Sequence, residues 1–243
     1  MESKYKSYSI ADSVGRIDSI LAGADTNYTE VNEIPSRDKL TFTNGFYVNC
    51  TCVVMDIRKS SELPDKYKRP TLAKIFRSCI SESVAILSSN LQCREINIHG
   101  DSVWGVFNTP TKSDIDTAFN AAYSLSSIVD ILNCRFKKKT GNIDPISVGI
   151  GVDYGRALML KAGYKGSAIN DVVWMGDVVN QATKLCSYGN KSWSDREIMV
   201  SSTIQQNLNE KNNELLEYHS ARSCYHGNIV RTDMNDWVRE NCS

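Results

Sequence analysis

Two aspartates stand where neighbouring strands are expected to end. Asp56 closes the apolar run FYVNCTCVVMDI, and Asp101 lies in the turn HGDS between two short strand-like runs. Carboxylates at strand ends, with a main-chain carbonyl such as that of Ile57 beside them, are hard oxygen ligands of the kind that Mg²⁺ and Mn²⁺ prefer. Each aspartate alone is more typical of a turn or a helix cap. Together they form a candidate metal site.

A second candidate group lies in the segment GDVVNQATK, residues 176–184. Asn180 and Lys184 are four residues apart and therefore share one face of the expected helix, while its apolar residues face elsewhere. An amide and an ammonium on one face can hold a ribose and a phosphate. The alternative interpretation is an ordinary amphipathic helix whose polar face lies in solvent.

The hydrophobic pattern after Asn44 predicts the order β-α-β-β-α-β. Residues 46–57 form a β-branched, apolar run that indicates a buried strand, and residues 94–107 predict a hairpin. Stretches from Pro70 and from Ala118 repeat apolar residues every three or four positions, as amphipathic helices do. This order is a split βαβ arrangement, a ferredoxin-like α/β fold with a mainly antiparallel sheet. Its first strand lies beside the hairpin, so the two aspartates are expected to converge.

Three glycines and a basic segment complete the pattern. Gly149 and Gly151 alternate with β-branched residues, which predicts a strand that another element approaches closely. Gly155 predicts a turn into a further strand, and the segment KKKTGN, residues 137–142, predicts a solvated loop. A helix is expected from about Ile10 to Leu21.

The composition excludes several classes of protein. The chain has 243 residues, 41% of them hydrophobic, and equal numbers of basic and acidic residues. It is therefore expected to be globular, and it lacks the basic excess typical of nucleic-acid binders. No apolar run approaches the roughly 18 residues of a spanning helix, and the N-terminus has no hydrophobic signal core. These observations predict a soluble, cytoplasmic protein with no membrane or nucleic-acid partner.

The eight cysteines are scattered, without a CxxC pair, and the three histidines are too dispersed in the sequence for a zinc quartet. Because no export signal is present, the cysteines are expected to be reduced thiols that act as small core residues. Cys50 and Cys52 are expected on one face of a strand.

Four segments in order resemble the catalytic domain of the class III nucleotidyl cyclases, over roughly residues 46–239. They are VVMDIRKSSEL, INIHGDSVWGVF, VGIGVDYGRALMLKAG and VVWMGDVVNQATKL. The resemblance implies synthesis of a 3′,5′-cyclic nucleotide and pyrophosphate from a nucleoside triphosphate. It also implies a head-to-tail homodimer whose sites lie at the interface, with residues 45–243 as the catalytic domain and residues 1–44 as an N-terminal arm.

The same resemblance implies a role for each candidate residue. Asp56 and Asp101, helped by the Ile57 carbonyl, would bind two Mn²⁺ or Mg²⁺ ions. Asn180 of one subunit would orient the ribose bound by the other, and Lys184 stands where the family usually has an arginine that stabilises the transition state. Lysine keeps the charge of that arginine but loses its bidentate fork. The phosphates would be held by the backbone of one segment: Ile57, Arg58, Lys59, Ser60 and Ser61.

Two departures from the family concern the base. Purine cyclases read the base with a polar pair, and here Asn97 and Val173 occupy its two positions. Val173 cannot form a hydrogen bond, whereas the Asn97 amide can donate and accept, which suits a smaller base such as uracil. Arg94 and Arg58 are further candidates for reaching the base.

The chain therefore resembles the pyrimidine cyclases of the bacterial Pycsar anti-phage system, whose product activates a separate effector. The expected enzyme is a uridylate cyclase that converts UTP to cUMP. The alternatives are a cytidylate cyclase, an adenylate cyclase with unusual base contacts, and an inactive nucleotide-binding regulator.

Overall fold

The central sheet of the protein is built around two long antiparallel strands, β2 (Gly45–Ile57) and β5 (Val148–Tyr164). The computed structural model describes residues 5–165 and 169–242. The sheet order is β3-β4-β2-β5-β7-β9-β8, with β1 parallel to β2 and β6 antiparallel to β5 at their far ends. The remaining strands are β1 (Tyr28–Glu30), β3 (Cys93–His99), β4 (Ser102–Asn108), β6 (Ile169–Met175), β7 (Ile198–Val200), β8 (Glu217–His219) and β9 (Cys224–Gly227).

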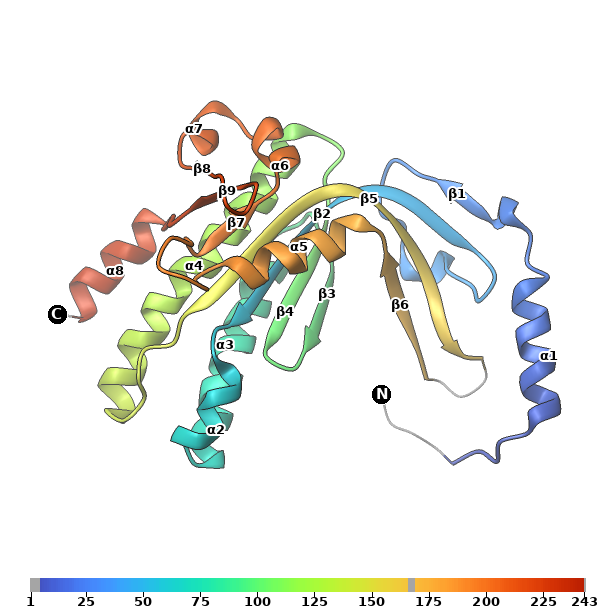
Figure 1. Cartoon of the computed structure of the whole chain (residues 1–243), viewed down its shortest axis with the longest axis horizontal. Helices are drawn as coiled ribbons and strands as arrows, with labels where there is room; N and C mark the ends of the chain where they lie inside the picture. Colours follow the sequence, from blue (N-terminus) through green and yellow to red (C-terminus); the bar gives the residue numbers. More distant parts are fainter. Residues whose placement is uncertain (1–4, 166–168, 243) are drawn as a thin grey trace.

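Helices cover both faces of this sheet (Figure 1). The helices α3 (Arg69–Ser88) and α4 (Lys112–Thr140) pack on one face, and α5 (Asp177–Tyr188) packs on the other. Two hydrophobic cores result: the first lies between the sheet and α3 and α4, and the second lies between the sheet and α5. Because side chains alternate along β2, Val53 and Met55 enter the first core, while Cys50 and Cys52 enter the second. The predicted βαββαβ order, the ferredoxin-like core and the shared face of the two cysteines are thus confirmed.

Glycine in β5 permits the close approach of α5. A Cβ at Gly151 would lie 2.0 Å from the Ala182 carbonyl oxygen, and one at Gly149 would lie 2.4 Å from that of Cys186. The backbone of α5 therefore rests directly on the backbone of the sheet, as the alternating glycines predicted.

Two local predictions are wrong. Gly155 does not end a strand, because β5 continues through it to Tyr164 and pairs with Cys50 of β2 at that point. Lys137, Lys138 and Lys139 do not lie in a loop but in the last turns of α4, which is capped by Gly141 with a φ of 65°. Lysines near a helix C-terminus are favoured by the helix dipole, so the solvated basic segment extends the helix.

The far ends of β2 and β5, together with β1, β6 and α1 (Ile10–Leu21), form an extension that we call the wing (Figure 1). The helix α1 has the predicted bounds and begins at the Ser9 cap, whose side chain accepts a hydrogen bond from the Asp12 amide. Its apolar residues, Ile10 and Leu21 among them, are exposed. Part of the expected N-terminal arm thus joins the sheet through β1.

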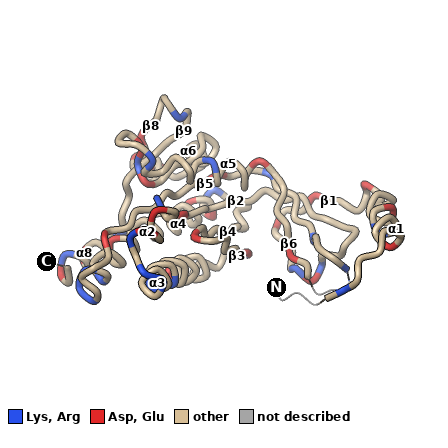
Figure 2. The backbone as a smooth tube through the Cα atoms, turned by 60° about the horizontal axis from the view of Figure 1, so that its bottom comes forward, with Lys and Arg blue, Asp and Glu red and all other residues tan. Residues whose placement is uncertain are grey.

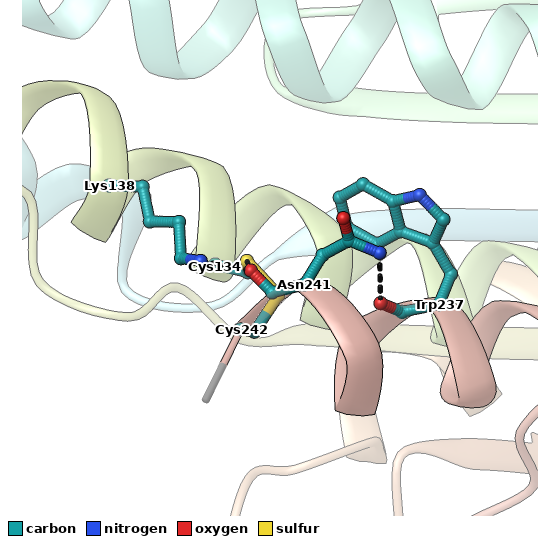
Figure 3. Close-up of a disulfide and its surroundings, with 5 residues drawn as sticks. All are labelled: Cys134, Lys138, Trp237, Asn241 and Cys242. Carbon is teal, nitrogen blue, oxygen red and sulfur yellow. Dashed lines mark hydrogen bonds between the residues drawn. A yellow bond between two sulfur atoms is a disulfide. The ribbon is translucent and has the colours of Figure 1, made fainter.

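A disulfide fastens the C-terminal helix to α4 (Figure 3). Cys134 of α4 and Cys242 of α8 (Thr232–Cys242) have Cα atoms 5.7 Å apart, a separation that a disulfide can bridge. The expectation of reduced thiols is wrong for this pair, because the packing of α8 along α4 joins positions that are 108 residues apart. Cys50, Cys52, Cys79, Cys93, Cys186 and Cys224 are free thiols.

Short elements connect these parts: the helices α2 (Leu63–Lys66), α6 (Ser202–Asn207) and α7 (Glu210–Asn213), and single turns at Asp25–Asn27, Arg37–Lys39 and Ser60–Glu62. Within the described ranges, no helix is both long and apolar enough to cross a membrane. Both basic (blue) and acidic (red) positions occur along the backbone of the body and of the wing (Figure 2).

Candidate active site

Asp56 and Asp101 meet at one end of the sheet, as the sequence predicted. Asp56 pairs in register with Ser102 of β4, the residue directly after Asp101. Partial burial and then the negative charge of Asp101 raise the pKa of Asp56, while the nearby Arg58 opposes the shift. The Oδ2 atom of Asp101 is buried and has no hydrogen-bond partner among the residues described.

This carboxylate pair fits a divalent cation. Two mutually repelling carboxylates, one with an unpartnered buried oxygen, gain free energy from a hard cation bound between them. The described residues contain no group of three or more His, Cys, Asp or Glu side chains that could hold a metal ion. Among the residues described, the pair Asp56 and Asp101 is therefore not part of a larger group of His, Cys, Asp or Glu side chains.

Arg58 joins the strand end to α5. Its Nη2 donates to Asp56 Oδ2 at 2.8 Å, and its Nη1 donates to the Ser187 carbonyl at 3.5 Å. Arg58 therefore contacts the carboxylate pair and does not line the pocket described below. Arg94 is an exposed residue of β3 and also lies outside that pocket. Neither arginine lines the pocket that contains Asn97 and Val173.

The segment 57–61 makes a sharp turn after β2. The Arg58 amide donates to the Ser147 carbonyl at 2.8 Å, which ends the pairing with β5. Lys59 then adopts a left-handed conformation, with a φ of 54°, and the turn of 3₁₀ helix from Ser60 to Glu62 follows. The backbone of these residues thus turns immediately beside Asp56.

A pocket of about 580 Å³ lies between β3, β4 and the wing strand β6. Asn97 and Val173, the two predicted base-contacting residues, both line it. Arg37, Trp104 and Trp174 also line the pocket and were not predicted from the sequence. Trp104 pairs in register with Asn97, so strand pairing offered a signal for it, whereas Arg37 comes from a segment whose placement no sequence pattern indicated.

Most polar groups around the pocket already have partners. Arg37 forms a bidentate interaction with the buried carboxylate of Glu95 and an ion pair of 3.2 Å with Asp171. Trp104 Nε1 donates to His99 Nδ1 at 3.2 Å. Two donors, Asn97 Nδ2 and Trp174 Nε1, are buried without an acceptor in the described part of the chain.

Asn180 and Lys184 share one face of α5, as predicted, and both residues are exposed. The opposite face carries the buried residues Val178, Ala182 and Leu185, which hold the helix on the sheet. No described hydrogen bond or ion pair joins Asn180 or Lys184 to the carboxylate pair. Within one chain the structure therefore brings Asp56 to Asp101 and Asn97 to Val173, and leaves Asn180 and Lys184 facing outward.

Comparison of the sequence with characterised proteins finds close relatives of one kind. A uridylate cyclase of Gulbenkiania mobilis is 38% identical over 263 aligned residues, which cover 99% of this chain and 100% of that protein. A uridylate cyclase of Treponema porcinum is 35% identical over 224 residues, which cover 90% of this chain and 77% of that protein. No protein-family model matches the sequence.

The fold is shared with solved class III cyclase structures. A class III adenylyl cyclase-like ATP-binding protein from Pseudomonas aeruginosa superposes with a TM-score of 0.71 at 15% identity, covering 93% of this chain and 48% of that one. The adenylyl cyclase CyaB from P. aeruginosa superposes with a TM-score of 0.60 at 18% identity, covering 72% of this chain and 85% of that one. At these identities the likeness concerns the fold.

Proposed function

The chain belongs to the uridylate cyclase family, and from this premise we propose that it converts UTP to 3′,5′-cyclic UMP and pyrophosphate. The observation that carries the proposal is the meeting of Asp56 and Asp101, with the unpartnered Oδ2 of Asp101, at the end of the sheet. The pocket lined by Asn97 and Val173 supports the choice of a pyrimidine, because Val173 offers a purine no polar partner.

We infer that Asp56, Asp101 and the Ile57 carbonyl hold two Mg²⁺ or Mn²⁺ ions. Held there, the ions would lower the pKa of the ribose 3′-hydroxyl and would neutralise charge on the α-phosphate. The turn from Ile57 through Ser61 presents backbone N–H groups to the β- and γ-phosphates. Lys184 supplies a positive charge to the α-phosphate, and Asn180 orients the ribose so that its 3′-oxygen faces the phosphorus atom.

We further propose that each site is shared by two copies of the chain, arranged head to tail. Support comes from the outward-facing Asn180 and Lys184, which no described interaction joins to the carboxylate pair of their own chain. The second copy would place its Asn180 and Lys184 opposite Asp56 and Asp101. The proposal extends to a cytoplasmic enzyme of anti-phage defence whose cUMP acts on a separate effector.

The reaction is tested by incubating the purified protein with each of the four nucleoside triphosphates and Mn²⁺, then identifying the products by mass spectrometry. UTP is expected to give cUMP, and Asp56→Ala or Asp101→Ala is expected to abolish it while the fold remains. Asp25→Ala, which changes an exposed aspartate in the turn between α1 and β1, serves as the control. Failure of the wild-type protein to form any cyclic nucleotide, or near-normal rates in either aspartate variant, contradicts the proposal.

The shared site is tested by mixing two inactive variants. Heterodimers of Asp56→Ala with Asn180→Ala contain one site in which every group is intact, so part of the activity is expected to return. Subunit exchange is followed in parallel with differently tagged chains. Exchange without any recovery of activity shows instead that the site lies within one chain.

A further inference from the structure

Arg37 joins the two strands on either side of the pocket that contains Asn97 and Val173. Its Nε donates to Glu95 Oε1 at 2.8 Å, and its Nη2 donates to Glu95 Oε2. Its Nη1 forms an ion pair of 3.2 Å with Oδ1 of Asp171. Glu95 belongs to β3 of the body and Asp171 to β6 of the wing, so one guanidinium bridges the body and the wing.

Both ends of this bridge lie next to the predicted base contacts. Glu95 precedes Asn97 by two positions on β3, where the pairing with β4 is regular. Asp171 precedes Val173 by two positions on β6, which pairs regularly with β5. Side chains two residues apart lie on the same face of a strand, so each carboxylate stands beside a pocket residue. Arg37 and Asp171 also line the pocket themselves.

The body end of the bridge is buried and held from two directions. The Glu95 side chain is only 4% exposed, and in the described part of the chain its carboxylate has no partner besides Arg37. A buried carboxylate without a partner is costly, so this contact is strongly favoured. Ile34 and Leu40, three residues to either side of Arg37, are buried in the second core. The guanidinium therefore projects from a segment that is anchored to the body.

The wing end of the bridge is exposed, with 52% of the Arg37 side chain and 47% of the Asp171 side chain accessible. An exposed ion pair adds little to the free energy of unfolding. The planar fork of an arginine nevertheless fixes the directions in which it donates, and here it engages Glu95 and Asp171 at the same time. The main effect of the bridge is therefore on the separation between β3 and β6.

Building on the proposed function, we propose that Arg37 is a positioning residue that sets the width of the base pocket and thereby favours a pyrimidine over the larger purines. While one guanidinium holds Glu95 and Asp171, β6 keeps its distance from β3, and Val173 keeps its distance from Asn97. A lysine at position 37 has a single ammonium in place of the fork. It can neutralise the buried Glu95 but cannot hold Asp171 in the same geometry, so the wing strand can move away and admit a purine.

The first test measures kcat and KM for UTP and ATP in the wild-type protein, in Arg37→Lys and in Arg156→Lys. Arg37→Lys keeps a cation beside Glu95 and is expected to fold. Its preference for UTP over ATP in kcat/KM is expected to fall by roughly threefold to tenfold, mainly through KM. Arg156→Lys is the matched control, because Arg156 pairs with Glu30 of β1 and does not line the pocket. This control is expected to keep the wild-type preference.

Asp171→Asn removes only the wing end of the bridge and leaves the buried end intact. It is expected to lower the preference for UTP over ATP by roughly twofold to fivefold, because an exposed ion pair is weak. In the background of Arg37→Lys the same substitution is expected to have no further effect. A direct contact between Asp171 and the base would instead give the same effect in both backgrounds and would overturn the bridge as its cause.

Hydrogen–deuterium exchange tests the bridge without any substrate. If Arg37 holds β6 at a fixed distance from β3, the backbone amides of residues 169–175 exchange faster in Arg37→Lys than in the wild-type protein. Arg156→Lys is expected to leave exchange in this segment unchanged. Thermal unfolding of each variant establishes that the comparison concerns folded protein.

The outcomes separate this inference from the proposed function. A wild-type protein that forms no cyclic nucleotide overturns the proposed function itself, and the exchange measurement still tests the bridge. Unchanged exchange of residues 169–175 in folded Arg37→Lys overturns the bridge whatever the activity. Faster exchange together with the wild-type preference for UTP over ATP overturns only the role of Arg37 in selecting the base.

Discussion

Asp56 and Asp101 occupy similar positions but have different surroundings. One oxygen of Asp56 accepts a hydrogen bond from Arg58, whereas Oδ2 of Asp101 has no partner within the described ranges. Replacement of Asp56 therefore removes a proposed metal ligand and also leaves the partly buried Arg58 guanidinium without its carboxylate. Replacement of either aspartate relieves the repulsion between the two carboxylates, but only replacement of Asp56 also deprives Arg58 of its partner. Thermal unfolding is therefore expected to show a lower Tm for Asp56→Ala than for Asp101→Ala, even if both variants are inactive.

Lys184 tests the chemical step at the scale of one side chain. If its ammonium stabilises charge on the α-phosphate, Lys184→Ala lowers kcat by a hundredfold or more, since electrostatic groups of this kind are worth about 3–4 kcal/mol in the transition state. Lys184→Arg, which keeps the positive charge, is expected to keep much of the wild-type kcat. Steady-state kinetics with UTP provides the measurement. An unchanged kcat with a raised KM would show that Lys184 only binds the substrate.

Glu197 gives the protein a pH dependence that is unrelated to catalysis. Burial raises its pKa to about 7, hydrogen bonds from Ser126 and Asn190 oppose the shift, and the charge of Asp130 adds to it. The folded state therefore keeps a proton that the unfolded state releases above its ordinary pKa of 4.5. The stability that this proton contributes is complete below that pH and is lost as the pH rises through about 7.

Glu197→Gln is accordingly expected to stabilise the protein at pH 8, by about 1–3 kcal/mol, and to have a much smaller effect at pH 5. The amide needs no proton to remain neutral, so the cost of burying a charge disappears. Thermal unfolding at the two pH values checks this, with the exposed Glu214→Gln as the control. Equal effects of Glu197→Gln at both pH values would exclude a titration of Glu197 in this range.

At the scale of elements, the contact between α5 and β5 depends on the absence of side chains at Gly149 and Gly151. Gly151→Ala places a Cβ 2.0 Å from the Ala182 carbonyl oxygen, and backbone atoms cannot give way as a flexible side chain can. We expect it to lower the free energy of unfolding by about 3 kcal/mol or more. Gly155→Ala meets nothing closer than the Val178 Cβ at 3.6 Å and is expected to change stability by less than about 1 kcal/mol. Denaturant unfolding of both variants provides the measurement. If side chains held α5 away from the sheet backbone, the two substitutions would have equal effects on stability.

The elements of the core were predictable because the apolar residues of each element follow one clear spacing. Alternating or continuous apolar residues identified β2, and apolar residues three and four apart identified α3, α4 and α5. The extent of β5 was not predictable, because a glycine usually interrupts a strand and only the pairing of Gly155 with Cys50 shows that this one does not. The same limit applies to the end of α4, where the three lysines read equally well as helix or loop.

The candidate site likewise contains residues that the sequence predicted and residues that it did not. Asp56, Asp101, Asn97 and Val173 were identified from strand ends and from family positions, and the first two were expected to converge because of the fold topology. Trp174 was not identified, because an unpartnered indole N–H is a property of the packed structure and not of the sequence. Arg37 was not identified either, because its segment, residues 31–40, has no repeating hydrophobic pattern. This segment packs against the second core.

At the scale of the whole molecule, the Cys134–Cys242 disulfide was beyond sequence reasoning, because only the docking of α8 on α4 brings these positions together. Its stabilising effect is expected to be large, since closing a loop of about this length restricts the unfolded chain by up to about 4–5 kcal/mol. A reductant is therefore expected to lower Tm by several degrees, and Cys134→Ser to show the lower Tm with no response to the reductant. Identical Tm values with and without the reductant would show that the bond is not formed in solution.

The disulfide also divides the sequence into an open part and a closed part. Residues 134–242 form a covalent loop that contains Val173, Asn180 and Lys184, while Asp56 and Asp101 lie outside it. A looped chain cannot extend fully when it is denatured, so the oxidised polypeptide has a smaller hydrodynamic radius than the reduced one and should run ahead of it on a denaturing gel. Electrophoretic mobility of chains trapped with an alkylating reagent then reports the redox poise of the compartment from which they were taken, even in cells where no substrate is being turned over.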